Sequence, residues 1–79
     1  MKIVYRDHAV SRMMVRRITP EEVAAVLKNP DGKIKQSANK WIYYRKLAKR
    51  EENAVAVVTV IVENTSFEVI TVMINFEVK

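Results

Sequence analysis

Apolar residues recur with two different periods along the chain, and the change falls at Gly32. Before it they return every three or four positions, and after it they alternate every second position. The first spacing is typical of helices that bury one face, and the second is typical of strands. The pattern therefore predicts two N-terminal helices followed by a sheet, an α+β fold in a single domain over residues 1–79.

The first predicted helix covers residues 7–17, with Asp7 as its N-cap. Its expected core side consists of Ala9, Val10, Met13, Met14 and Ile18. The second helix has a sharper start, because Thr19 and Glu22 have the spacing of a capping box and Pro20 takes the first helical position. Its apolar stripe consists of Val23, Val26 and Leu27.

Four strands are predicted as an antiparallel meander, covered on one face by the two helices. Their ranges are 33–37, 40–47, 54–62 and 67–76, and a short strand at 2–5 is left open. We expect the even-numbered residues of the last two strands to face the core: Ala56, Val58, Val60, Val62, Ile70, Val72, Ile74 and Phe76. A loop at 64–66 then pairs Glu63 with Phe67 and Thr59 with Thr71. The opposite face is also apolar, so we expect a homodimer contact or a partner protein to cover part of it.

The net charge of +5 is distributed unevenly. Residues 1–50 hold thirteen Lys and Arg against four acidic residues, whereas residues 51–79 hold one lysine against five glutamates. A basic half suits a polyanion such as RNA, because each neutralised phosphate releases condensed counterions. Solubility and pairing with the glutamates are the other explanation.

Several classes of site are excluded by composition. The chain has no cysteine and one histidine, which argues against a disulfide, a thiolate nucleophile or a metal site. It has no glycine-rich phosphate loop, and we expect no cofactor. No apolar run is long enough for a signal peptide or a membrane span, which predicts a cytoplasmic protein without membrane contact.

One constellation has the right chemistry for RNA. His8, Arg12 and Arg16 are spaced i, i+4, i+8 and share one side of the first helix, and Arg17 follows at its end. The histidine can move a proton, and the arginines can hold phosphate oxygens while the RNA supplies its own nucleophile. We predict His8, Arg12 and Arg16 as catalytic candidates. In the alternative, structural interpretation the two arginines pair with Glu21, Glu22 or Glu51.

An aromatic and basic strand is the second candidate. Trp41, Tyr43 and Arg45 share one of its faces. Such a face can stack unpaired bases, and it also fits an ordinary core strand. The predicted RNA-binding residues are Arg17, Tyr43, Tyr44, Arg45 and Lys46. A basic rim around this strand is expected from Lys33, Lys35, Lys40, Lys46, Lys49 and Arg50, either as an extension of the base-stacking surface or as an ordinary solvated edge.

Residues 8–18 read His-Ala-Val-Ser-Arg-Met-Met-Val-Arg-Arg-Ile. They resemble the H-A-x-x-R-M-x-x-R-x-I motif of a family of small bacterial and archaeal domains of unknown function, although a glycine is common there at the position of Arg17. The order of helices and strands is similar to that of RelE-like toxins, within the barnase–EndoU–colicin–RelE grouping. The resemblance implies an RNA-directed, metal-independent ribonuclease with an antitoxin partner. The positions that match the family are His8, Arg12 and Arg16 in this motif and Thr71 in the segment Val69-Ile70-Thr71-Val72, which resembles the family's last strand.

Two classes of function stay open on the sequence alone. The first is an RNA-directed protein of the RelE-like type, either a ribonuclease or an RNA binder. The second is a non-catalytic interaction module, either a homodimer or paired with an acidic partner, in which the helix motif is structural. Binding of a small anionic metabolite between the first helix and the sheet is a third option.

Overall fold

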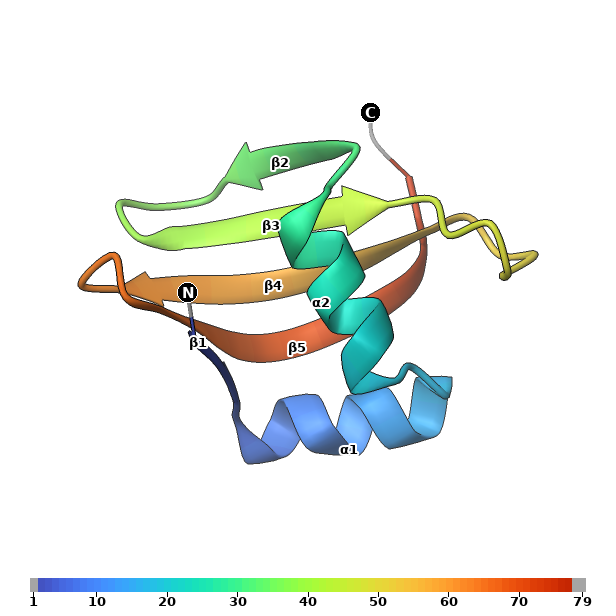
Figure 1. The fold of residues 1–79 in the computed structure, drawn as a ribbon, viewed down its shortest axis with the longest axis horizontal. Coiled ribbons are helices and arrows are strands. Elements are labelled where there is room, and N and C mark those ends of the chain that lie inside the picture. Colours follow the sequence, from blue (N-terminus) through green and yellow to red (C-terminus); the bar gives the residue numbers. More distant parts are fainter. Residues whose placement is uncertain (1, 78–79) are drawn as a thin grey trace.

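The order of helices and strands is the predicted one, with an additional strand at the start (Figure 1). The computed structural model describes residues 2–77. Its elements in chain order are β1 (Lys2–Tyr5), α1 (Asp7–Arg16), α2 (Pro20–Lys28), β2 (Gly32–Lys35), β3 (Lys40–Arg45), β4 (Ala54–Val62) and β5 (Ser66–Phe76). In this range no helix is both long enough and apolar enough to cross a membrane. The predicted α+β class is confirmed.

The sheet is mixed and has five strands in the order β1-β5-β4-β3-β2. β2 to β5 form the predicted antiparallel meander, whereas β1 pairs parallel with β5, from Lys2 opposite Ser66 to Tyr5 opposite Val69. The prediction of four antiparallel strands therefore holds for this meander but lacks the fifth, parallel strand at the edge of the sheet, which the sequence left open. The reason for the parallel pairing is the crossover: α1 and α2 carry the chain from β1 at one edge to β2 at the other (Figure 1).

The predicted register of β4 and β5 is also wrong. Thr71 lies opposite Val58 rather than Thr59, and Phe67 lies opposite Ile61 rather than Glu63. The register shifts between Val58 and Thr59 and again between Ala54 and Ala56. A β-bulge places an extra residue in one strand and turns the following side chains to the other face. One register therefore cannot describe this whole pair of strands.

The main core lies between the sheet and both helices, and it corrects the predicted face of β4. Its buried residues are Ala9, Met13, Ile18, Val23, Val26, Leu27, Tyr43, Val55, Val57, Val69 and Val72. On β4 these are the odd-numbered residues, not the even-numbered ones that we expected. On β5 the bulge divides the predicted set, because Val72 and Ile74 join this core while Ile70 and Phe76 pack on the other face.

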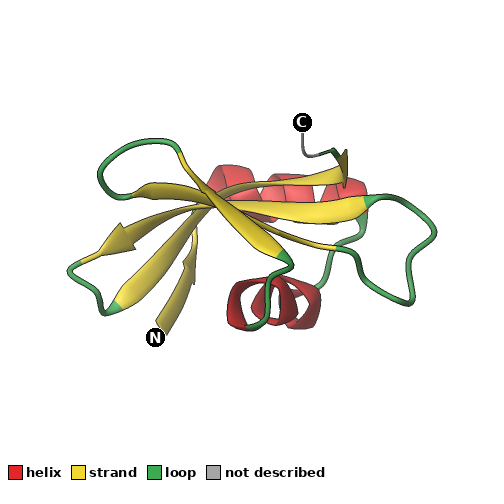
Figure 2. Ribbon diagram, turned by 90° about the horizontal axis from the view of Figure 1, so that it is seen from above, coloured by secondary structure: helices red, strands yellow, loops and turns green. Residues whose placement is uncertain are grey.

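The second face of the sheet carries a small cluster of its own. Ile42, Ala56 and Val58 are buried there, with partly buried side chains from Tyr44, Ile70, Met73 and Phe76 packed against them. The sheet is strongly twisted (Figure 2), and the rings of Tyr44 and Phe76 approach to 5.6 Å between centroids. The chain therefore buries the centre of this face itself, and cover by a partner stays a prediction.

The start of α2 follows the predicted capping box. The Thr19 hydroxyl accepts a bond from the Glu22 N–H (3.2 Å), and the Glu22 carboxylate accepts one from the Thr19 N–H (2.9 Å). These two bonds satisfy N–H groups that the first turn of a helix leaves without partners. The predicted stripe of α2 is confirmed, because Val23, Val26 and Leu27 are all buried.

The ends of α1 differ from the prediction. Arg6, not Asp7, is the N-cap, and no side chain caps this end. Asp7 lies instead in the first turn, where its charge suits the helix dipole. Arg17 lies outside the helix as its C-cap, in the left-handed conformation (φ 56°). Two side chains predicted to be in the core are exposed, Val10 at 43% and Met14 at 75%.

Candidate nucleic-acid interface

One flank of α1 presents the predicted row of basic side chains to solvent. His8, Arg12 and Arg16 are all exposed. Within residues 2–77 none of the three forms an ion pair or a side-chain hydrogen bond, so the structural interpretation of the arginines through Glu21, Glu22 or Glu51 is not realised there. The buried side chains of Ala9 and Met13 anchor the helix to the core. The row is thus held on a packed element with its charges directed outward.

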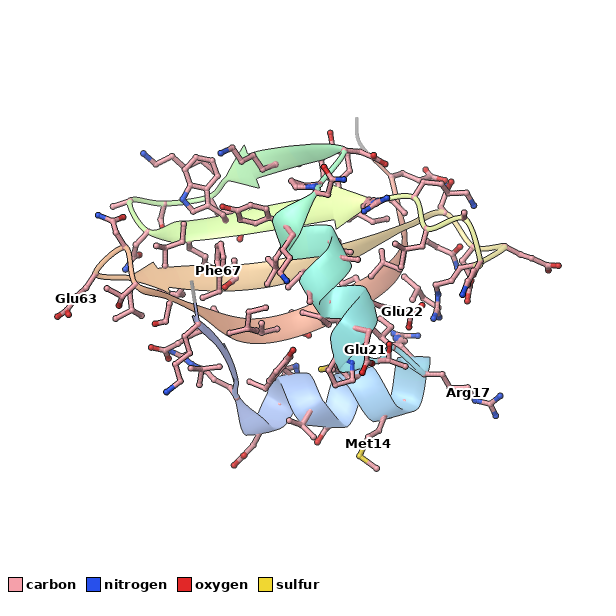
Figure 3. All side chains as sticks on the ribbon, viewed as in Figure 1. Met14, Arg17, Glu21, Glu22, Glu63 and Phe67 are labelled. Carbon is pink, nitrogen blue, oxygen red and sulfur yellow. The ribbon has the colours of Figure 1, made fainter. Side chains whose placement is uncertain are left out.

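Arg17 extends this basic surface beyond the end of α1. Its side chain points away from the molecule (Figure 3), while its carbonyl oxygen accepts a bond of 3.1 Å from Arg50. The guanidinium group is exposed. The predicted RNA-binding role of Arg17 is therefore sterically open.

The two predicted tyrosines lie on opposite faces of the sheet. Tyr43 is buried on the helix-bearing face in edge contact with Phe67 (5.6 Å between centroids), and this burial raises the pKa of its hydroxyl. Tyr44 lies on the other face against Phe76 and directly over Gly32, where a Cβ atom would collide with its ring. The structure therefore does not bring the two rings together as one surface for bases.

Arg45 and Lys46 are bound to the protein itself. Arg45 donates to the carbonyl oxygen of Ala25 in α2 (3.5 Å). The Lys46 backbone N–H donates to the Asp31 carboxylate (2.8 Å). The Lys46 ammonium group donates to three loop carbonyl oxygens, those of Arg50, Glu51 and Glu52. Arg45 thus contacts α2 and Lys46 holds the loop after β3, and their contact with RNA stays a prediction.

Arg50 has a role that the sequence reasoning missed. We expected it in a basic rim, but its side chain is only 13% exposed and lies at the junction of α1 and α2. It donates to the carbonyl oxygens of Arg16, the last residue of α1, and of the C-cap residue Arg17 (both 3.1 Å). It also forms ion pairs with Glu22 (3.0 Å) and Glu52 (3.2 Å). No local sequence pattern indicates these contacts, because most of the partners are far away along the chain.

The Arg50 junction shifts the titration of its members. Burial alone would raise the pKa of Glu22, but the pKa is lowered because the carboxylate accepts the Thr19 N–H bond and faces the Arg50 guanidinium. Burial works against the charge of Arg50 as well, yet its pKa is raised because Glu22 and Glu52 stabilise the cation. Glu22 and Arg50 are therefore both charged at neutral pH, and their ion pair stabilises the junction of α1 and α2.

The other flank of α1 borders an apolar groove. It is lined by Tyr5, Val10, Met13, Met14, Arg17, Ile18, Thr19 and Pro20 and has a volume of about 470 Å³. The Met14 side chain extends from this side of α1 into solvent (Figure 3). One helix therefore carries a basic flank and an apolar flank on either side of its buried stripe.

No metal centre is evident in the part of the chain that the structure describes, since no three His, Asp or Glu side chains gather there as potential ligands. Comparison with the curated proteins finds no match, and comparison with the solved structures finds none either. Residues 5–74, from the end of β1 into β5, match the family described as Domain of unknown function (DUF4258). The chain therefore belongs to this family of uncharacterised small domains.

Proposed function

We propose that the protein is directed to RNA and that the basic flank of α1 is its phosphate-binding surface. The supporting observation is the contrast in how its cations are partnered. Arg6 pairs with Glu68 (2.9 Å) and Arg50 with Glu22 and Glu52, whereas His8, Arg12 and Arg16 have no acidic partner within residues 2–77. An external polyanion is the natural complement of an exposed row of such charges.

The row also has the groups for metal-independent cleavage of RNA. Neutral His8 accepts the proton of a 2′-hydroxyl as that oxygen bonds to phosphorus. The bond from phosphorus to the 5′-oxygen then breaks, and water protonates the leaving oxygen. Arg12 and Arg16 stabilise the negative charge that develops on the phosphoryl oxygens, which is the general role of guanidinium groups at such sites. We propose this cleavage step together with the RelE-like activity that the resemblance implies.

The test is a gel assay with labelled structured RNA and single-stranded RNA at low and at physiological salt. We expect a retarded band that weakens with salt. Arg12→Ala should weaken it and lower the salt slope by about one. Lys49→Ala, which removes an exposed cation on the loop after β3 rather than on α1, is the matched control and should bind as the wild type does. If cleavage accompanies binding, a folded His8→Ala variant should lose about 10²–10⁴-fold in rate.

Each part of the proposal has an outcome that contradicts it. No shift and no cleavage at either salt concentration contradicts the direction to RNA. Equal binding by Arg12→Ala and Lys49→Ala excludes the α1 row as the phosphate-binding surface. Cleavage by His8→Ala at the wild-type rate removes the proton-transfer role and leaves an RNA-binding module.

The apolar groove favours a second candidate function, a protein–protein contact. The occupant that we consider is a second copy of the chain, because a twofold axis would place the same apolar residues of two grooves against each other. Sedimentation of wild type and Met14→Lys tests this contact. Val15→Lys is the control, since Val15 is also apolar and exposed (68%, against 75% for Met14) but does not line the groove. A wild-type monomer at all concentrations contradicts the dimer.

A further inference from the structure

One end of the sheet lies beyond α2 on the face that the helices cover (Figure 1). Three aromatic rings pack there one against the next, those of Trp41, Tyr43 and Phe67. Trp41 on β3 is half-buried there, with 6.5 Å between its ring centroid and that of Tyr43. Tyr43 in turn contacts Phe67 on β5, whose ring lies on this part of the sheet (Figure 3). Of the three rings, Tyr43 is buried, whereas Trp41 and Phe67 are only partly buried.

Two lysines of the edge strand β2 reach over Trp41. The Lys33 and Lys35 ammonium nitrogens lie 5.3 and 5.7 Å from its ring centroid. Both residues are exposed, and neither forms an ion pair within residues 2–77. Because β2 and β3 are paired, Lys33 opposite Tyr43 and Lys35 opposite Trp41, the position of these cations relative to the ring is set by the sheet.

A hollow of about 330 Å³ opens beside Trp41, between the loop after β2 and the loop after β4. Its lining residues are Ala38, Asn39, Trp41, Ile61, Glu63 and Asn64. The Ile61 N–H donates to the Asn39 carbonyl oxygen (2.8 Å), which ties the two loops together. The Glu63 carboxylate points away from the molecule (Figure 3), so it does not occupy the hollow. The other polar residues of its lining are Asn39 and Asn64.

We infer that this hollow binds one unpaired base of single-stranded RNA, and the inference rests on the proposed direction to RNA. Trp41 provides the apolar ring against which a base stacks. The asparagine amides both donate and accept hydrogen bonds, as the edge of a base requires. The volume is at the lower end of the range for small-molecule sites, about 300–1,000 Å³, which suits a single base. Lys33 and Lys35 neutralise the adjoining phosphates.

A strand, rather than a free nucleotide, is the ligand that the arrangement favours. The two lysines lie along β2, outside the hollow, so a base in the hollow leaves them to contact phosphates on the neighbouring nucleotides. A duplex is excluded from this mode of binding, because its bases are paired and stacked on one another. The predicted order of affinity is therefore single strand first, then mononucleotide, then duplex.

The chain contains one tryptophan, so intrinsic fluorescence reports directly on Trp41. We would titrate the full chain with a short single-stranded RNA, a duplex of the same sequence and a nucleoside monophosphate. Quenching by the single strand is expected, and Asn39→Ala should weaken it about two- to tenfold, as for one lost hydrogen bond. Lys33→Gln and Lys35→Gln should each lower the salt slope by about one, with Lys49→Gln as the matched control.

The outcomes separate this inference from the proposed function. RNA retardation that depends on Arg12 but leaves Trp41 fluorescence unchanged overturns the hollow and keeps the α1 surface. Quenching that Asn39→Ala weakens and Arg12→Ala does not supports the hollow and contradicts the α1 surface. Equal affinity for the mononucleotide and the single strand contradicts the inference that a strand is the preferred ligand. If Lys33→Gln lowers only the melting temperature, the lysine serves the Trp41 ring alone and the phosphate contact is overturned.

Discussion

The basic row on the flank of α1 and the Arg50 junction at its end contain the same kind of side chain in opposite circumstances. The side chain of Arg50 is 13% exposed and donates to two carbonyl oxygens at the C-terminal end of α1 and to two carboxylates. Arg12 and Arg16 are exposed and make no such bond within residues 2–77. The difference is one of location, because a buried cation needs partners and an exposed one is solvated by water. Basic residues in one chain can therefore serve the fold or face a ligand.

The largest effect on stability is expected from Arg50→Ala. The substitution removes bonds to both ends of the α1–α2 connection and leaves Glu22 facing the junction without its cation. Hydrogen bonds to charged groups contribute about 1.5–3 kcal/mol each, and the partial exposure of the pair reduces the total. We expect a loss of about 2–3 kcal/mol in chemical denaturation. Lys49→Ala is the control, and an equal loss in both variants would place Arg50 with the solvated cations.

An intermediate effect is expected from the charge of Glu22, as a dependence on pH. The pKa of Glu22 is lowered in the folded chain from its usual 4.5, so its charge stabilises the fold above pH 4.5. This contribution is lost as the pH falls through the folded-state pKa, because the Glu22 carboxyl group is then protonated in the folded and in the unfolded chain alike. Glu22→Gln keeps an acceptor for the Thr19 N–H and removes the charge.

Unfolding of wild type, Glu22→Gln and Glu21→Gln should be followed from neutral pH to about pH 2. Glu22→Gln should be less stable than wild type at neutral pH, and the two should converge in acid. Glu21 is exposed and forms no ion pair in the described range, so its variant should follow the wild-type curve. Parallel curves for wild type and Glu22→Gln would show that the charge of Glu22 does not stabilise the junction.

The smallest effect on stability is expected on the flank of α1. Arg12→Ala and Arg16→Ala should each change the free energy of unfolding by less than about 0.5 kcal/mol, as exposed substitutions usually do. Thermal unfolding measures this directly. A loss as large as that of Arg50→Ala would show that the row is structural, and it would favour the interaction module over the RNA-directed protein.

Local signals in the sequence predict much of this fold. Thr19 and Glu22 are three positions apart, and the bonds between them form wherever that turn becomes helical. The strand segments were also recognisable, with bounds that differ by a few residues, because alternation is a property of neighbouring positions. The exposed row from His8 to Arg16 follows from helical spacing in the same way, and its exposure could be expected from the sequence.

The register of β4 and β5 could not be predicted from the sequence. Both strands carry apolar residues on both faces, so the alternation of apolar and polar positions alone does not select one register. The bulge at Val58 and Thr59 can be recognised only when the pairing of β4 with β5 is known. The contacts of Arg50 cannot be predicted for a related reason: Glu22 and the Arg16 carbonyl oxygen are 28 and 34 positions away, and only the folded chain brings them together.

The parallel pairing of β1 with β5 has a consequence for the order of events during synthesis. β1 emerges from the ribosome before the other strands, but within residues 2–77 it pairs only with β5. The ion pair between Arg6, which directly follows β1, and Glu68 on β5 joins residues 62 positions apart. Until β5 emerges, the buried stripes of α1 and α2 lack part of the surface that covers them. Contacts of such long separation slow folding. The nascent helices therefore remain incompletely packed, with apolar side chains accessible to chaperones, until β5 has been synthesised.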